Sequence, residues 1–145
     1  MKSFFDDLKL ENQLCFPLYA ASRNVIREYK PFLDKLDLTY TQYIAMMVLW
    51  EHKQTNVKEL GKRLYLDSGT LTPVLKSLET KGFVRRSRST EDERVLLVEL
   101  TEKGAQLREA AAEVPGKVSG CLTLPVEEAR QLYQLLYRVL GEITE

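Results

Sequence analysis

Residues 56–100 read NVKELGKRLYLDSGTLTPVLKSLETKGFVRRSRSTEDERVLLVEL, a stretch that predicts two helices followed by a hairpin. Apolar residues recur at helical spacing in both predicted helices: Val57, Leu60 and Leu64, then Leu71, Leu75 and Leu78. The residues 67–69 supply a turn and a helix cap between them, and Gly82 suits the position just after the second helix. Two strand-like segments, 83–88 and 95–100, flank a polar turn at 89–93. This order is the outline of a winged helix-turn-helix.

The second helix carries a polar face that suits a DNA major groove. We expect this face to present Ser68, Thr70, Thr72, Lys76 and Ser77. Short hydroxyls and one cation match the donors and acceptors of base edges and phosphates. Taken alone, the same pattern is equally compatible with an ordinary polar surface. Pro73 removes one backbone hydrogen bond inside a helix, so this helix is expected to begin close to Asp67.

The hairpin concentrates positive charge, and we expect Arg86, Arg88, Asp92 and Arg94 to lie at a DNA interface. A charge run is usually a solvated face, but here residues 53–94 hold ten Lys or Arg and six Asp or Glu, a net charge of +4. The whole chain has 21 of each sign, so the remainder carries −4. Such an asymmetry is an electrostatic footprint for DNA. Asp92 stands two residues before Arg94, a spacing that can hold the arginine extended toward a minor groove.

Composition predicts one domain without a cofactor or a metal. The chain has 145 residues and no apolar run of about 18 residues, so no membrane span is expected. Its N-terminus lacks the long apolar core of a signal peptide, which favours a cytoplasmic protein. The two cysteines, Cys15 and Cys121, stand far apart with no CxxC pair, which excludes a zinc knuckle. No glycine-rich phosphate loop is present.

The segments before residue 56 predict two more helices. A first helix is expected to begin around Gln13 and to be interrupted at Lys30-Pro31. Thr39 is a suitable N-cap for a second helix over residues 40–52, whose nearly continuous apolar run predicts burial on most sides. Residues 53–55 are expected to form a short polar link.

The segments after residue 100 predict a pair of helices that ends in an apolar stripe. Thr101 can cap a helix whose apolar face extends to Val118, although Pro115-Gly116 loosens it. Pro125 stands at or near the start of the last helix. That helix carries a wide apolar stripe, formed by Leu132, Leu135, Leu136, Val139, Leu140 and Ile143. So much apolar surface on a terminal helix predicts a partner, either the first helix of its own chain or another subunit.

Cys15 shares one helical stripe with Tyr19 and Tyr29. If the first helix begins around Gln13, Cys15 lies in its first turn, where the helix N-terminus favours thiolate over thiol. Phenol groups can stabilise a thiolate by hydrogen bonding, and Tyr29, Tyr40 and Tyr19 are the candidates. The alternative is that Cys15 is only a small buried hydrophobe.

Several motifs closely resemble the MarR family of bacterial regulators. These are residues 69–79 (GTLTPVLKSLE), 81–86 (KGFVRR), 92–94 (DER) and 98–104 (VELTEKG). The resemblance covers nearly the whole chain. It implies a two-fold homodimer on a pseudo-palindromic duplex, with Arg94 in the minor groove and the helix of Thr70 and Thr72 in the major groove.

Residues 14–23 (LCFPLYAASR) and 38–43 (LTYTQY) resemble the organic-hydroperoxide-sensing, OhrR-like branch of that family. This resemblance implies that Cys15 is oxidised by organic hydroperoxide and that Tyr29 and Tyr40 hold its thiolate. It also implies that Cys121 matches the second, resolving cysteine that some members carry. Pro17 follows a pattern found in only part of the branch.

These observations predict a mainly α protein with a small β-hairpin wing, in which helices at both ends serve dimerisation. Residues 1–145 form one domain, with a DNA-binding lobe at about 56–100 and a dimerisation lobe at about 1–38 and 101–145. Two other readings stay open. One is a MarR-like repressor released by a small aromatic ligand held between the lobes, and the other is a thiol peroxidase that uses Cys15.

Overall fold

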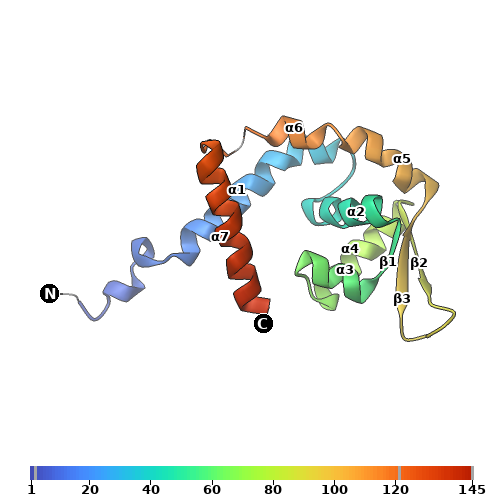
Figure 1. Cartoon of the computed structure of the whole chain (residues 1–145), viewed down its shortest axis with the longest axis horizontal. Coiled ribbons are helices and arrows are strands. Elements are labelled where there is room, and N and C mark those ends of the chain that lie inside the picture. The colour runs from blue at the N-terminus through green and yellow to red at the C-terminus, as the bar shows by residue number, and fades with distance from the viewer. Residues whose placement is uncertain (2, 121, 145) are drawn as a thin grey trace.

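The computed structural model describes residues 1, 3–120 and 122–144, without the side chains of residues 142–144. Its helices are η1 (Asp6–Leu8), η2 (Leu10–Asn12), α1 (Cys15–Asp34), α2 (Tyr40–His52), α3 (Val57–Leu64), α4 (Ser68–Thr80), α5 (Glu102–Ala111), α6 (Val114–Val118) and α7 (Val126–Thr144). The strands are β1 (Gln54–Asn56), β2 (Val84–Arg88) and β3 (Leu96–Leu100). Figure 1 shows α2–α4 and the sheet on one side, with α1, α6, α7 and an extended N-terminal arm on the other.

Polar caps start α2, α4 and α5 where the sequence predicts them. The Thr39 hydroxyl accepts from the backbone N–H of Gln42, whose side chain accepts in turn from the Thr39 N–H, a complete capping box for α2. The side chain of Asp67 accepts from the Thr70 N–H at 2.7 Å and starts α4. The predicted cap at Thr101 is confirmed as well, because its hydroxyl accepts from the N–H that begins α5.

The two predicted apolar faces meet in one core beneath the helix-turn-helix. Leu60 of α3 and Leu71 and Leu78 of α4 are fully buried together with Met46 and Leu49 of α2. Gly82 follows α4 with φ +83°, a left-handed conformation that favours glycine and turns the chain into β2. The predicted winged helix-turn-helix is therefore confirmed.

The sheet has three strands in the order β1-β3-β2, although the sequence predicted only a hairpin. Residues 54–56 pair with β3 in antiparallel register, with Thr55 opposite Val98. The prediction of a polar link at residues 53–55 is therefore wrong. Three residues are too few to show the alternating pattern of a strand, and only the tertiary pairing with β3 makes this segment extended.

Two helix boundaries also differ from the sequence prediction. Helix α1 continues through Pro31 to Asp34, because a proline in the last turn leaves only one earlier carbonyl unpaired and Leu33 is buried in the core. The predicted helix after Thr101 divides into α5 and α6 at residues 112–113, just before Pro115. Pro17 is the third residue of α1, where the missing N–H has no helical acceptor in any case.

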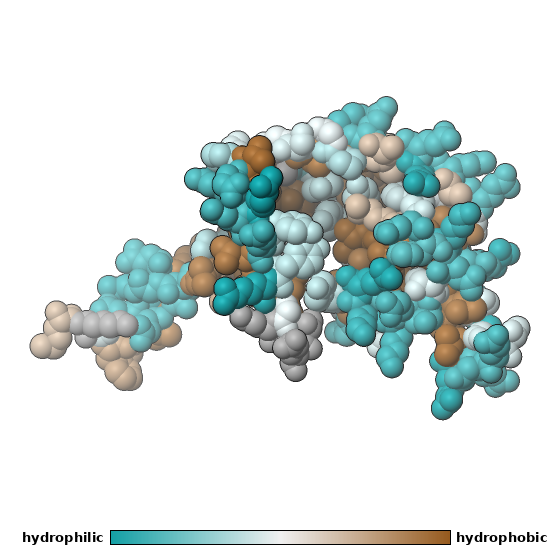
Figure 2. Space-filling model, in the orientation of Figure 1, coloured by the Kyte–Doolittle hydropathy of each residue, from teal (hydrophilic) through white to brown (hydrophobic). Residues whose placement is uncertain are grey.

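Apolar surface remains uncovered on the lobe formed by the N-terminal arm, α1 and α7. Large exposed side chains on this lobe include Phe4, Leu8, Leu14, Leu18, Ile26, Tyr133, Leu135 and Val139. Figure 2 shows hydrophobic residues on the surface of the arm and where α7 crosses α1. No described side chain of α7 is buried, so this helix has no place in the core of its own chain. Within the described ranges, no helix is both long and apolar enough to cross a membrane.

Candidate nucleic-acid interface and thiol site

The N-terminal half of α4 presents its polar groups at the open face of the DNA-binding lobe. Ser68, Thr70 and Lys76 are exposed, whereas Thr72 is half-buried and its hydroxyl donates to the Ser68 carbonyl at 2.7 Å. The backbone N–H of Thr70 holds the pKa of Asp67 below its usual value, so the cap stays ionised. This face of the helix therefore offers hydroxyls and one cation to a ligand.

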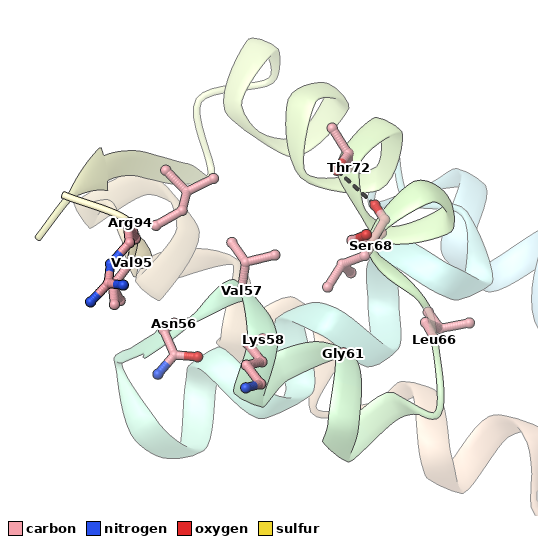
Figure 3. A pocket seen from close by; sticks show the side chains of 11 residues that line it. Asn56, Val57, Lys58, Gly61, Leu66, Ser68, Thr72, Arg94 and Val95 are labelled. Carbon is pink, nitrogen blue, oxygen red and sulfur yellow. Dashed lines mark hydrogen bonds between the residues drawn. The ribbon is translucent and has the colours of Figure 1, made fainter. Parts of the chain in front are cut away.

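A groove of about 550 Å³ separates this helix from the hairpin. Figure 3 shows Ser68 and Thr72 on one side of it, Arg94 on the other, and Asn56 and Lys58 from the start of α3 along the floor. The floor also includes apolar side chains such as Val57. The groove thus joins the predicted major-groove and minor-groove elements across one continuous surface.

Arg94 stands at the tip of the hairpin, and its side chain is 90% exposed. Both oxygens of the Asp92 carboxylate accept from its guanidinium, at 3.1 Å from Nε and 3.3 Å from Nη2. The guanidinium also holds the pKa of Asp92 below its usual value. The predicted tether between these residues is confirmed, and it holds a fully charged side chain away from the protein. Arg88 is also exposed and makes only a long contact, 3.5 Å, with the Glu93 carbonyl.

The structure corrects the prediction for Arg86. Its side chain is only 19% exposed, and Nη2 donates to Glu79 Oε1 of α4 at 3.2 Å. The Arg86 backbone N–H donates to Glu79 Oε2 at 3.0 Å. These bonds hold the pKa of Glu79 below its usual value, the backbone N–H being the largest cause. Arg86 therefore lies against the recognition helix and does not point toward a ligand.

Ser77 also lies away from the open face, so its predicted place there is wrong. It is half-buried at the C-terminal end of α4, where its hydroxyl accepts from Gln42 Nε2 at 2.9 Å. Gln42 is buried at 5% exposure and accepts from Lys81 Nζ at 2.9 Å. Lys81 in turn donates to the backbone carbonyl of Asp37. This polar cluster joins the α1–α2 turn, the first turn of α2 and the end of α4.

Helix α1 begins at Cys15, two residues later than predicted, so Cys15 lies in the first turn as expected, and it is an exposed free thiol. One turn further, the Tyr19 hydroxyl accepts from Arg23 Nη1 at 3.2 Å, and the Arg23 guanidinium lies 5.5 Å from the centre of the Tyr19 ring. Cys121, the second predicted redox residue, lies outside the described residues.

Tyr29 and Tyr40 form an aromatic cluster with Tyr43 at the far end of α1. The rings of Tyr29 and Tyr40 meet edge to face, with their centres 5.1 Å apart. Burial, reinforced by Tyr29, raises the pKa of Tyr40, so this phenol stays protonated and remains a hydrogen-bond donor.

Within one chain, the structure does not bring Cys15 and these tyrosines together. Cys15 and Tyr29 are separated by 14 positions of one continuous helix, which at 1.5 Å per residue is about 21 Å. The stripe correctly placed them on one face of α1, and their separation along the sequence keeps them apart along the same helix.

Sequence reasoning missed Gln42, Glu79 and Lys81. The pattern Thr39-x-x-Gln42 is a capping-box signature, so Gln42 had a local signal. Glu79 and Lys81 had none, because their partners lie on other elements. Over the described part of the chain, no group of three or more His, Cys, Asp or Glu side chains is arranged to hold a metal ion.

Comparison with known proteins places this arrangement among transcriptional regulators. Residues 27–110 match the family model "Transcriptional regulator SarA/Rot". The organic hydroperoxide resistance transcriptional regulator of Bacillus subtilis is 53% identical over 140 residues, which covers 97% of this chain and 95% of that protein.

Two solved structures show the same fold on DNA. Reduced AbfR of Staphylococcus epidermidis bound to DNA is 37% identical, with a TM-score of 0.79 over 97% of this chain and 98% of that one. A mutant of MarR from E. coli in complex with operator DNA is 26% identical, with a TM-score of 0.80 over 96% of this chain and 99% of that one.

Proposed function

Because this chain belongs to the MarR/SarA family of transcriptional regulators, we propose that it is a DNA-binding repressor that organic hydroperoxides release by oxidising Cys15. The observation that carries the DNA-binding half is the Asp92–Arg94 tether beside the open face of α4. The observation that carries the sensing half is an exposed thiol at the start of α1 in a chain 53% identical to an organic hydroperoxide resistance regulator. Such a regulator acts on the chromosome, so we propose a cytoplasmic location.

The DNA-binding unit in this proposal is a homodimer on a pseudo-palindromic duplex. Each chain carries one recognition helix, and the exposed apolar residues of the arm, α1 and α7 supply a surface for a second copy. The two copies of α4 would then occupy major grooves one helical turn apart, about 34 Å. Ser68, Thr70, Thr72 and Lys76 would contact this groove, and Arg88 and Arg94 would contact the flanking backbone and minor groove.

The sensing site in this proposal is shared between subunits. Tyr29 lies about 21 Å along α1 from Cys15 of its own chain, and Tyr40 of α2 packs against Tyr29, so neither phenol is within hydrogen-bond distance of that thiol. We therefore assign the phenols that hold the Cys15 thiolate to the partner chain, where an antiparallel arrangement of two α1 helices would bring them close. Tyr19, which is one turn from Cys15, remains the candidate from the same chain.

Oxidation of Cys15 by a hydroperoxide produces a sulfenic acid and an alcohol, and the sulfenic acid can condense with a second thiol to give a disulfide and water. We propose Cys121 of the partner as that thiol. The α-carbons of the two residues would have to come within about 7 Å, which would move the lobe that holds α7. Mass spectrometry of the oxidised protein tests the bridge, because a linked Cys15–Cys121 peptide pair supports it and Cys15 found only as a mixed disulfide contradicts it.

Two alternative functions are a thiol peroxidase and a repressor released by a small aromatic ligand. A thiol peroxidase conflicts with membership of a family of regulators, so we set it aside. Release by a small aromatic ligand keeps the same DNA-binding unit but needs no thiol chemistry. It predicts DNA release by a ligand that leaves Cys15 reduced.

The deciding experiment is a DNA-binding titration with and without cumene hydroperoxide, for the wild type and for Cys15→Ser. We expect both proteins to bind a duplex selected from a random library, and only the wild type to be released by peroxide. Serine is nearly isosteric with cysteine, and Cys15 is exposed, so the variant should fold normally. If peroxide releases Cys15→Ser at the wild-type dose, the sensing residue lies elsewhere.

A further inference from the structure

One carboxylate, Glu79 of α4, holds both the backbone and the side chain of one residue in the wing. Its Oε2 accepts from the Arg86 backbone N–H at 3.0 Å, and its Oε1 accepts from Arg86 Nη2 at 3.2 Å. Arg86 is four-fifths buried at this contact. A second guanidinium donor, Nε, is buried without a hydrogen-bond partner. The guanidinium is thus enclosed against α4, and it cannot turn toward a phosphate without breaking the bond to Glu79.

The Glu79–Arg86 pair connects α4 to the free edge of the sheet. Strand β2 is an edge strand, because the order is β1-β3-β2. Arg86 stands in its middle, opposite Val98 of β3, and its N–H points off the free edge toward α4. The other hydrogen bonds between α4 and the hairpin lie at the root, where Gly82 and Phe83 donate to the last carbonyls of the helix.

Beyond the root, the contacts of the wing are local. Arg88 contacts the Glu93 carbonyl, and Asp92 holds Arg94. Among the residues that the structure describes, the Glu79 carboxylate is the hydrogen-bonding group that joins α4 to the hairpin past Val84. Core packing of Val84 and Val98 with the leucines of α4 fixes the base of the hairpin, and the Glu79 contact is the hydrogen-bonded link to α4 nearest the wing tip.

We propose that Glu79 and Arg86 are positioning residues for DNA recognition. The pair sets the angle between α4 and the hairpin, so that α4 and Arg94 enter adjacent grooves at the same time. This inference rests on the proposed DNA-binding function and adds to it two residues that touch no DNA. It also gives Arg86 a role in place of the direct contact that the sequence predicted.

The test asks whether Glu79→Gln raises or lowers the affinity for DNA. The substitution removes a negative charge from the DNA-binding lobe and loosens Arg86, so electrostatic attraction alone predicts tighter binding. A positioning role predicts weaker binding, by about tenfold, since a charge-assisted hydrogen bond is lost and Arg94 is no longer held in register. Affinity is measured by fluorescence anisotropy on a duplex selected from a random library.

Glu99→Gln is the matched control. Glu99 lies on β3, pairs with Arg85 at 2.9 Å, and carries the same charge as Glu79. It has no bond to α4, so its substitution should leave the affinity unchanged or slightly higher. Equal or tighter binding by Glu79→Gln, with the wild type binding normally, overturns the positioning role. A wild type that binds no duplex overturns the proposed function instead.

A double-mutant cycle separates positioning from loss of folding. If the pair acts by placing Arg94, then Arg94→Ala should cost much less affinity in the Glu79→Gln background than in the wild type. Arg86→Met gives a second route to the same cycle if Glu79→Gln does not fold. Full additivity of either pair contradicts the proposal, because independent contacts add.

Discussion

At the scale of single residues, the DNA-binding surface separates into side chains that are free to act and side chains that hold others. Arg94 is 90% exposed, whereas Arg86 is 19% exposed, although both are arginines of one hairpin. The difference arises because Asp92 directs Arg94 outward, while Glu79 holds Arg86 against α4. The charged residues in the sequence therefore indicate where the DNA-binding surface lies, and the ion-pair partner of each arginine decides whether it is free to contact DNA.

Arg94→Ala should weaken DNA binding by about tenfold or more without lowering the melting temperature, because the side chain has no packing contacts to lose. The loss should be greatest on duplexes with A·T-rich flanks, where the minor groove is narrow. Arg85→Ala is the control, since it removes the same charge from the sheet face of the same hairpin. A similar loss of affinity for both variants would mean that Arg94 contributes only its positive charge, and would argue against its insertion into the minor groove.

A mixed dimer tests whether the thiol site is shared. One chain carries Cys15→Ser, and the other carries Tyr29→Phe with Tyr40→Phe. If the tyrosines act across subunits, the one remaining Cys15 faces intact phenols and should be oxidised at the wild-type rate. If the tyrosines act within the chain, oxidation of this Cys15 should be as slow as in the Tyr29→Phe/Tyr40→Phe homodimer. Differential tags allow the mixed dimer to be purified, and stopped-flow oxidation supplies the rate.

At the scale of elements, a polar cluster joins the start of α2 to the end of α4. Gln42 is its centre, because it caps α2 through Thr39 and bonds both Ser77 and Lys81. Tyr40 lies in the same helical turn as Gln42. The proposed thiolate-binding phenol and the recognition helix are therefore connected through a buried side chain.

Gln42→Met should lower the free energy of unfolding by about 1–3 kcal/mol, since methionine keeps the length of glutamine but leaves the half-buried Ser77 and Lys81 without their hydrogen bonds to it. Chemical denaturation measures this loss. The control is Gln106→Met on α5, where the side chain is exposed and the change should stay within about 0.5 kcal/mol. Equal stability of both variants would mean that the cluster contributes nothing to folding.

At the scale of the whole molecule, the chain divides its apolar residues between a closed core and an open surface. The core below the helix-turn-helix is complete within one chain, with Leu60, Leu71 and Leu78 fully buried. The arm, α1 and α7 leave theirs exposed, and no described side chain of α7 is buried. A second copy of the chain is the partner that we expect on this surface.

Leu135→Glu should convert the dimer to a monomer and abolish specific DNA binding, because it introduces a charge into the apolar face of α7 at a residue that is 56% exposed in the single chain. Gln134→Glu, one position away on the exposed side of α7, adds the same charge and should have no effect. Sedimentation velocity gives the oligomeric state. A Leu135→Glu protein that remains dimeric would exclude this face of α7 from the interface.

The helix-turn-helix could be predicted because its signals are local. Each of these signals acts within a few residues of the chain, so it can be recognised in the sequence. They are the periodic leucines, the caps at Thr39, Asp67 and Thr101, and Gly82. The tether of Arg94 by Asp92 belongs to the same class, because two positions separate the partners.

Tertiary structure decided what depends on distant partners. Strand β1 exists because β3 pairs with it, Arg86 is held because Glu79 lies across from it, and Ser77 turns inward because Gln42 is buried beneath α4. The sequence alone therefore determined the caps, the turns and the Asp92–Arg94 tether, and the fold determined which distant residues meet, because contact depends on three-dimensional distance.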